Sequence, residues 1–189
     1  MTEQNKINTK EVNVMKKKMM IVSMILFIGV LAFAITYHFT QKEVPLSFAI
    51  TFGTAFYHFA MRLVVGHLIN AIFHNKMNAN RWWFQERKFE PKLYQWLRVK
   101  KWKKHMPTYN PKDYSLNEHS PEEIVQVTCQ AEIVHEVIMV LSFVPVVFII
   151  WFDSLAAFLI TSCIAFLIDS AFVILQRYNR PRLRKIRRR

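Results

Sequence analysis

Four long apolar runs divide the chain, and short polar connections separate them. The runs cover residues 19–38, 46–73, 133–152 and 155–176. Each reaches or exceeds the roughly 20 residues that a helix needs to cross a hydrocarbon core about 30 Å thick. We therefore expect an all-α integral membrane helical bundle with about four transmembrane helices, forming one membrane domain over residues 1–189.

The first apolar run follows a basic region, as a secretory signal peptide does. Its apolar part is longer than the core of a signal peptide, and no small-residue cleavage site follows it. We therefore expect this run to stay attached as a membrane anchor.

Positive charge is concentrated at three places along the chain. Lys16, Lys17 and Lys18 precede the first run; residues 76–104 carry ten Lys and Arg against two Glu; residues 177–189 carry eight and no acid. The connections at 39–45 and 152–154 are near neutral or acidic. Because basic segments stay on the cytoplasmic side, we expect a multi-pass protein of the cell membrane with both termini, the segment 76–120 and the basic tail 177–189 in the cytoplasm.

The net charge of +13, together with 52% apolar residues, favours a partner with an anionic surface. In the segment 76–120 aromatic rings alternate with Lys and Arg, which is typical of short amphipathic helices at the head-group level. Nucleic acid is the rival partner for such a composition, but four spans already place lipid beside it. We expect membrane lipids as partners and no nucleic acid, and no sequence feature indicates an oligomeric state.

A helix start is well marked after this segment. Ser120 suits the N-cap, Pro121 the first helical position, and Glu123 the position that completes a capping box. We expect this helix to run through Glu132 and His135 into the third span without a break.

Polar residues inside the apolar runs are the candidates for function, because a charged group near the bilayer centre costs several kcal/mol unless it faces a partner. They are His58, Arg62, His67, Asn70, His74, Glu132, His135, Glu136 and Asp169. Helical spacing places His67, Asn70 and His74 on one face, and His58 and Arg62 on another. Pairs such as Arg62 with Asp169 fit a role in packing. Glu132 and His135 are three residues apart, so a carboxylate lies beside an imidazole, a pairing that orients a general base.

Three segments carry a resemblance to a known family. They read "FQERKFEPKLYQWLRVKKWKKHMP", "QAEIVHEVIMVLSFVPVVF" and "QRYNRPRL", in this order. Over roughly residues 66–184 the chain resembles the glycosyl-4,4'-diaponeurosporenoate acyltransferase family, whose named member esterifies a sugar hydroxyl of a glycosylated carotenoid with a fatty acyl chain. For this chain the resemblance implies acyl transfer to a hydroxyl of a glycosylated or otherwise amphiphilic lipid.

Acyl transfer assigns roles to the candidate residues. His135 would take the proton of the acceptor hydroxyl and Glu132 would hold its ring, while Asn70 would face the developing oxyanion, as would Asn179. The expected substrate-binding residues are Arg177, Tyr178, Asn179, Arg180, Arg182, Lys100, Lys101, Trp102, Lys103, His67 and His74, with the cations on the phosphates of a donor such as acyl-CoA. The chain has no nucleophile-elbow serine, so we expect direct transfer without a cofactor.

Three alternatives stay open. Glu132 and His135 have the spacing of a di-iron carboxylate motif, with His67, His74 or Glu136 as further ligands, but such sites normally use two of these pairs and the chain has one, so we expect no metal. A non-catalytic protein that binds anionic lipid or scaffolds lipid-synthesis enzymes would also explain the charge and the tryptophans. The third alternative is a transferase that moves a different group onto a lipid.

Overall fold

The computed structural model describes residues 3–152 and 154–187, and the side chains of residues 17–152 and 154–186. Within these ranges the chain is helical and has no strands, which confirms the expected fold class. The four long helices are α1 (Glu3–Thr40), α2 (Glu43–Phe73), α5 (Pro121–Leu141) and α6 (Leu155–Arg187). Four segments are long and apolar enough to cross a membrane, namely Lys17–Thr40, Glu43–Phe73, Pro121–Ile150 and Leu155–Ile186.

Two boundaries differ from the sequence expectation. The third span changes from the α-helix α5 to the 3-10 helix η4 (Val144–Ile150), whose first turn contains Pro145. Proline has no N–H to donate and cannot continue an α-helix, which accounts for the change. The fourth helix does not end at residue 176 but continues to Arg187, so most of the basic tail is helical. The expectations for Asp153, Arg188, Arg189 and the side chains of Lys16 and Arg187 lie outside the described residues.

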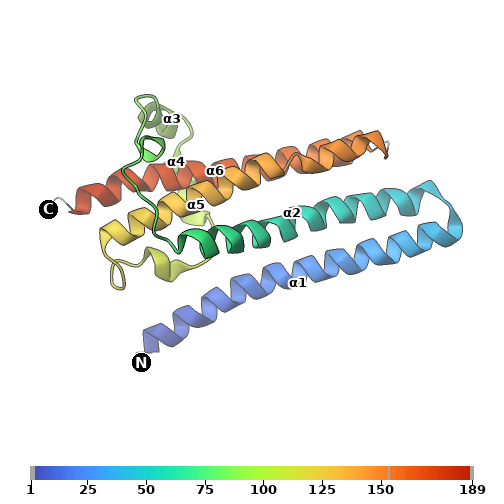
Figure 1. Ribbon diagram of the computed structural model, residues 1–189, viewed down its shortest axis with the longest axis horizontal. Coiled ribbons are helices and arrows are strands. Elements are labelled where there is room, and N and C mark those ends of the chain that lie inside the picture. The colour runs from blue at the N-terminus through green and yellow to red at the C-terminus, as the bar shows by residue number, and fades with distance from the viewer. Residues whose placement is uncertain (1–2, 153, 188–189) are drawn as a thin grey trace.

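The helices form two antiparallel hairpins, and α2 of the first packs against both α5 and α6 of the second (Figure 1). The N-terminal part of α1, the C-terminal part of α6 and the segment between α2 and α5 lie at one end of the bundle, and the turn between α1 and α2 lies at the other end (Figure 1). Glycine lets the first hairpin close, because a Cβ atom on Gly29 would lie 2.3 Å from the ring of Phe52. The pair α2 and α5 is held by an apolar cluster of Met61, Val65 and Ile69 with Ile138.

Short helices make up the segment between α2 and α5, as expected. They are η1 (Trp82–Phe84), α3 (Glu90–Trp96), α4 (Val99–Trp102), η2 (Lys103–His105) and η3 (Pro111–Tyr114). Trp82, Phe89 and Trp96 expose their rings, whereas Phe84, Tyr94 and Val99 are buried. The segment therefore has an apolar side on the bundle and an aromatic, basic side that faces outward.

The start of α5 has the expected capping box. The Ser120 hydroxyl accepts a hydrogen bond from the backbone N–H of Glu123 (3.3 Å), and the Glu123 carboxylate accepts one from the backbone N–H of Ser120 (2.7 Å). We expect Ser120→Ala to lower the free energy of unfolding by about 1 kcal/mol, because the backbone N–H of Glu123 loses its acceptor.

Denaturation midpoints in detergent micelles test this prediction. Ser120→Asp is the matched control, since it keeps an acceptor at the N-cap and should hold the wild-type midpoint. Equal midpoints for wild type and Ser120→Ala would show that the capping box does not stabilise α5.

Candidate functional site

A cluster of four charged side chains lies where α5, α6 and the segment 83–90 meet. Glu132 is fully buried, and its two carboxylate oxygens accept from Arg177 (2.5 Å) and from Arg180. Arg177 also donates to Glu90 through Nε (2.9 Å) and Nη2 (2.5 Å). Two carboxylates therefore face two guanidinium groups, and the buried charges balance, as buried ions require.

The phenol of Tyr94 extends this charge cluster by donating to Glu90 (2.7 Å). Burial raises the pKa of Tyr94, and the hydrogen bond to Glu90 raises it further, so the phenol remains a donor at any physiological pH.

The same arginines fix the segment 83–90 onto the bundle through its backbone. Arg177 donates to the carbonyl oxygens of Trp83 (3.0 Å) and Gln85 (3.0 Å), and Arg180 donates to that of Phe84 (3.1 Å). This geometry corrects the expectation that Arg177 and Arg180 bind donor phosphates, because their N–H groups are committed within the protein. It also corrects the expected role of Glu132, whose carboxylate pairs with these arginines and not with an imidazole.

His135 has a different carboxylate partner. Its Nδ1 lies 2.8 Å from Oδ1 of Asp169, and the other oxygen of Asp169 pairs with Arg62. Asp169 is buried, while the side chains of His135 and Arg62 are 20% and 19% exposed. The expected pair of Arg62 with Asp169 is confirmed. The contact of Asp169 with His135 was missed, because a separation of 34 residues leaves no spacing signal in the sequence.

This contact fixes which nitrogen of His135 is basic. A carboxylate paired with a guanidinium can only accept, so Nδ1 of His135 carries the proton and donates to Asp169. The ring stacks on Phe172, with centroids 4.5 Å apart and planes at 6°. Among the described residues, no side chain hydrogen-bonds to Nε2, so its lone pair is available to take a proton.

Several expected site residues lie elsewhere. The amide oxygen of Asn70 accepts a hydrogen bond from the side chain of Gln130 (3.1 Å). Gln130 precedes His135 by five residues on α5, so roughly 7.5 Å of helix separates the two. His67 and His74 are exposed, and His74 has left-handed backbone angles that end α2. Glu136 accepts from the indole N–H of Trp83 (3.0 and 3.2 Å). The structure thus does not gather these residues around His135.

A second group of expected residues does come together, at the end of the bundle. The ring of Tyr178 has the guanidinium of Arg182 at 3.5 Å and the amine of Lys103 at 5.1 Å from its centroid. Lys103 also donates to the side-chain oxygen of Asn179 (3.4 Å). Partial burial lowers the pKa of Lys103, and the positive charges of Arg182 and Lys100 lower it further. An anion bound here would relieve this repulsion.

Lys100 and Lys101 are exposed beside this group, and Trp102 supports it by donating to the backbone of Leu97 (3.0 Å). We refer to Lys100, Lys101, Lys103 and Arg182 as the basic surface.

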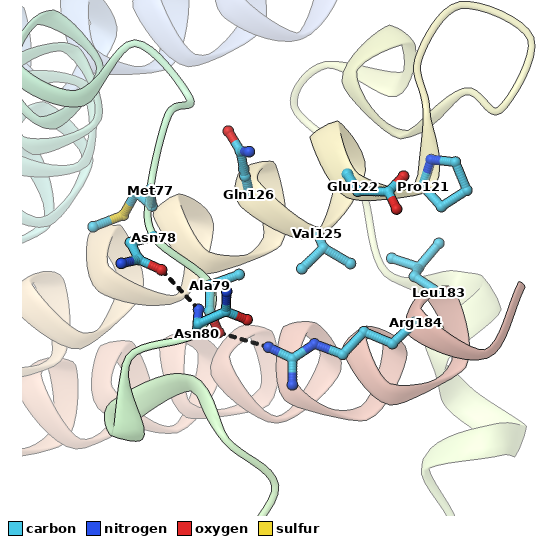
Figure 2. A pocket seen from close by; sticks show the side chains of 10 residues that line it. All are labelled: Met77, Asn78, Ala79, Asn80, Pro121, Glu122, Val125, Gln126, Leu183 and Arg184. Carbon is cyan, nitrogen blue, oxygen red and sulfur yellow. Dashed lines mark hydrogen bonds between the residues drawn. The ribbon is translucent and has the colours of Figure 1, made fainter. Parts of the chain in front are cut away.

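A cavity of about 170 Å3 lies further along the bundle, between the loop after α2 and the ends of α5 and α6 (Figure 2). Its lining consists of Met77, Asn78, Ala79, Asn80, Pro121, Glu122, Val125, Gln126, Leu183 and Arg184. Arg184 donates to the backbone of Ala79 (2.6 Å) at its wall (Figure 2). Gln126 is nine residues from His135 on α5, so roughly 14 Å of helix separates this cavity from the imidazole.

Within residues 3–152 and 154–187, no three His, Cys, Asp or Glu side chains are grouped so that they could hold a metal ion. The two residues with di-iron spacing, Glu132 and His135, take separate partners on α6.

Neutralising Glu132 tests the charge cluster. We expect Glu132→Gln to lower the free energy of unfolding by about 3–5 kcal/mol, since it leaves buried guanidinium charge uncompensated. Thermal unfolding followed by circular dichroism measures the change, and Glu86→Gln, at an exposed carboxylate nearby, serves as the control. A midpoint for Glu132→Gln equal to that of the control would contradict a structural role for this ion cluster.

One of the comparisons with known proteins identifies a family. Neither a curated protein nor a solved structure matches the chain. Residues 80–189, more than half of the chain, match the family described as glycosyl-4,4'-diaponeurosporenoate acyltransferase. This range contains the charge cluster, the basic surface, His135 and Asp169, so the matched region and the candidate site coincide. The chain therefore belongs to the glycosyl-4,4'-diaponeurosporenoate acyltransferase family.

Proposed function

We propose that this membrane protein transfers a fatty acyl group from a thioester donor to a hydroxyl of a glycosylated or otherwise amphiphilic lipid, with His135 as the general base. The observation that supports this most directly is the hydrogen bond of 2.8 Å between His135 and Asp169, which leaves Nε2 as the basic nitrogen. A base held by a buried carboxylate, beside lipid, suits a hydroxyl that reaches the site from the bilayer.

The transfer needs one proton movement in each direction. Nε2 of His135 takes the hydroxyl proton as the acceptor oxygen attacks the carbonyl carbon of the thioester, and a new C–O bond forms. The C–S bond then breaks, and the imidazolium returns its proton to the departing thiolate. Asp169 stabilises the imidazolium between these steps, and Arg62, on the same carboxylate, supplies positive charge near the developing oxyanion.

Lipid mass spectrometry of expressing membranes tests the reaction and the base together. We expect wild type to produce a lipid heavier by one acyl group, and His135→Ala to lower its rate of formation by about 10²–10⁴-fold. Asp169→Asn should lower the rate in the same way, because an amide no longer holds Nδ1 protonated. His38→Ala, at an exposed histidine of α1, is the control at equal protein abundance.

The possible results separate the hypotheses. An undiminished product with His135→Ala would refute the catalytic assignment and leave the reaction standing. If wild type changes no lipid in a host that contains glycosylated lipid precursors, the non-catalytic lipid-binding alternative gains instead.

We further propose that the basic surface binds the phosphates of the donor from the cytoplasm. It lies at the end of the bundle that also holds the N-terminal part of α1 and the C-terminal part of α6 (Figure 1). Positively charged segments of membrane proteins stay preferentially on the cytoplasmic side. The location of three basic regions at one end of the bundle therefore supports a cytoplasmic position for that end.

Sealed vesicles of defined orientation test this sidedness. We expect acyl-CoA to support transfer when added to inside-out vesicles, and not when added to right-side-out ones. The double variant Lys100→Gln, Lys101→Gln should raise the KM for acyl-CoA severalfold at low salt and less at high salt, because exposed charges are screened. Lys42→Gln, in the turn at the opposite end, is the control. Equal transfer in both orientations would refute the placement.

A further inference from the structure

His58 is a buried residue of α2 that the mechanism above does not use. It is 5% exposed, and among the described residues neither of its ring nitrogens has a hydrogen-bond partner. A buried polar group without a partner costs about 1–3 kcal/mol, and the two ring nitrogens of His58 gain no hydrogen bond that would offset this cost. Ser162 of α6 is also fully buried with its hydroxyl unpartnered in the described structure.

Gly66 lies on the same face of α2, eight residues after His58 and four after Arg62. A Cβ atom at Gly66 would meet nothing within 4 Å, whereas one at Gly29 would strike Phe52. Close helix packing therefore explains Gly29 and does not explain Gly66. Glycine inside a helix is about 1 kcal/mol less favourable than alanine. At Gly66 this cost is not offset by closer packing, and the missing side chain leaves open space beside α2.

The register of α2 against α5 places this face at the level of His135. Tyr57 donates to the backbone of Leu141 (2.9 Å), and Asn70 accepts from Gln130, so the two helices run antiparallel. Counting inward from both contacts, His135 lies level with the part of α2 between Arg62 and Gly66. The partial exposure of His135 and Arg62 shows that this level is accessible from outside the bundle.

We propose that the face of α2 formed by His58, Arg62 and Gly66 is the slot by which the acceptor lipid enters from the bilayer, an inference that rests on the proposed function. Gly66 leaves room for the lipid beside the helix backbone, and its reacting hydroxyl meets Nε2 of His135. His58 hydrogen-bonds a second polar group of the same lipid. The charge of Arg62 is already paired with Asp169, so this face offers hydrogen-bonding groups and no unpaired cation, and the slot takes a neutral amphiphile with several hydroxyl groups rather than an anionic phospholipid.

Photo-crosslinking in vesicles tests the slot without requiring turnover. The probe is an alkyl glucoside with a diazirine in its alkyl chain, added to the full-length protein, and digestion with mass spectrometry locates the labelled peptides. We expect labelling of the peptide of α2 that contains Gly66 in wild type and also in His135→Ala. Gly66→Leu should reduce it at least fivefold, and Gly66→Ala should reduce it less. Ala71→Leu, which places the same side chain at an exposed position of α2, should label like wild type.

The outcomes distinguish this inference from the proposed function. Labelling that spreads evenly over the lipid-facing helices, or that survives Gly66→Leu, would overturn the slot. Labelling at Gly66 in a protein that transfers no acyl group would leave the slot standing and refute the reaction.

The variant His58→Leu tests the role of His58 through two measurements, the thermal midpoint and the KM for the acceptor. Removing an unpartnered buried imidazole should raise the thermal midpoint, because the desolvation penalty disappears. The same variant should raise the KM for the acceptor at least tenfold with a smaller effect on kcat, since His58 binds the lipid and does not touch the reacting atoms. A raised midpoint with an unchanged KM would overturn the role of His58.

Discussion

The carboxylate of Glu132 between Arg177 and Arg180 is the interaction on which the arrangement of this protein depends. It joins α5 to α6, and the same guanidinium groups bind the backbone at residues 83–85. Burying a carboxylate with two cationic partners costs desolvation free energy, and removing one of the partners destabilises the fold strongly because it leaves a buried charge uncompensated. The bonds to the backbone attach the start of the segment between α2 and α5 to the bundle, and the basic surface lies later in the same segment and on α6.

The polar residues within the bundle form two groups that differ in how completely their hydrogen-bonding atoms are paired. The group around Glu132 is saturated with hydrogen bonds and holds elements together, whereas the group around Asp169 leaves one nitrogen of His135 open. The carboxylate of Asp169 links three helices at this level, because His135 of α5 contacts one of its oxygens and Arg62 of α2 the other.

The sequence predicted the long helices, the cap at Ser120 and the pair of Arg62 with Asp169, because each depends on local composition or on the cost of charge in lipid. The partners inferred from the sequence were wrong where the contacting side chains come from distant segments of the chain. The three-residue spacing of Glu132 and His135 placed both on one side of α5, but two different parts of α6 face them, arginines at one level and Asp169 at the other. The spacing of two residues along one helix determines on which side of the helix they lie. It does not determine which side chains of a neighbouring helix lie opposite them. The continuation of α6 beyond residue 176 was missed for a related reason, since its basic turns are stabilised by contacts with residues nearly a hundred positions earlier.

The unbroken course of α6 has a mechanical consequence. From Leu155 to Arg187 it is a single helix of 33 residues, roughly 50 Å long, which is longer than the hydrocarbon core it crosses. Asp169, Arg177 and Arg180 therefore lie on one continuous helix. A membrane that thickens or thins changes the tilt of a helix that crosses it, so Asp169 and the two arginines, all on α6, would move together.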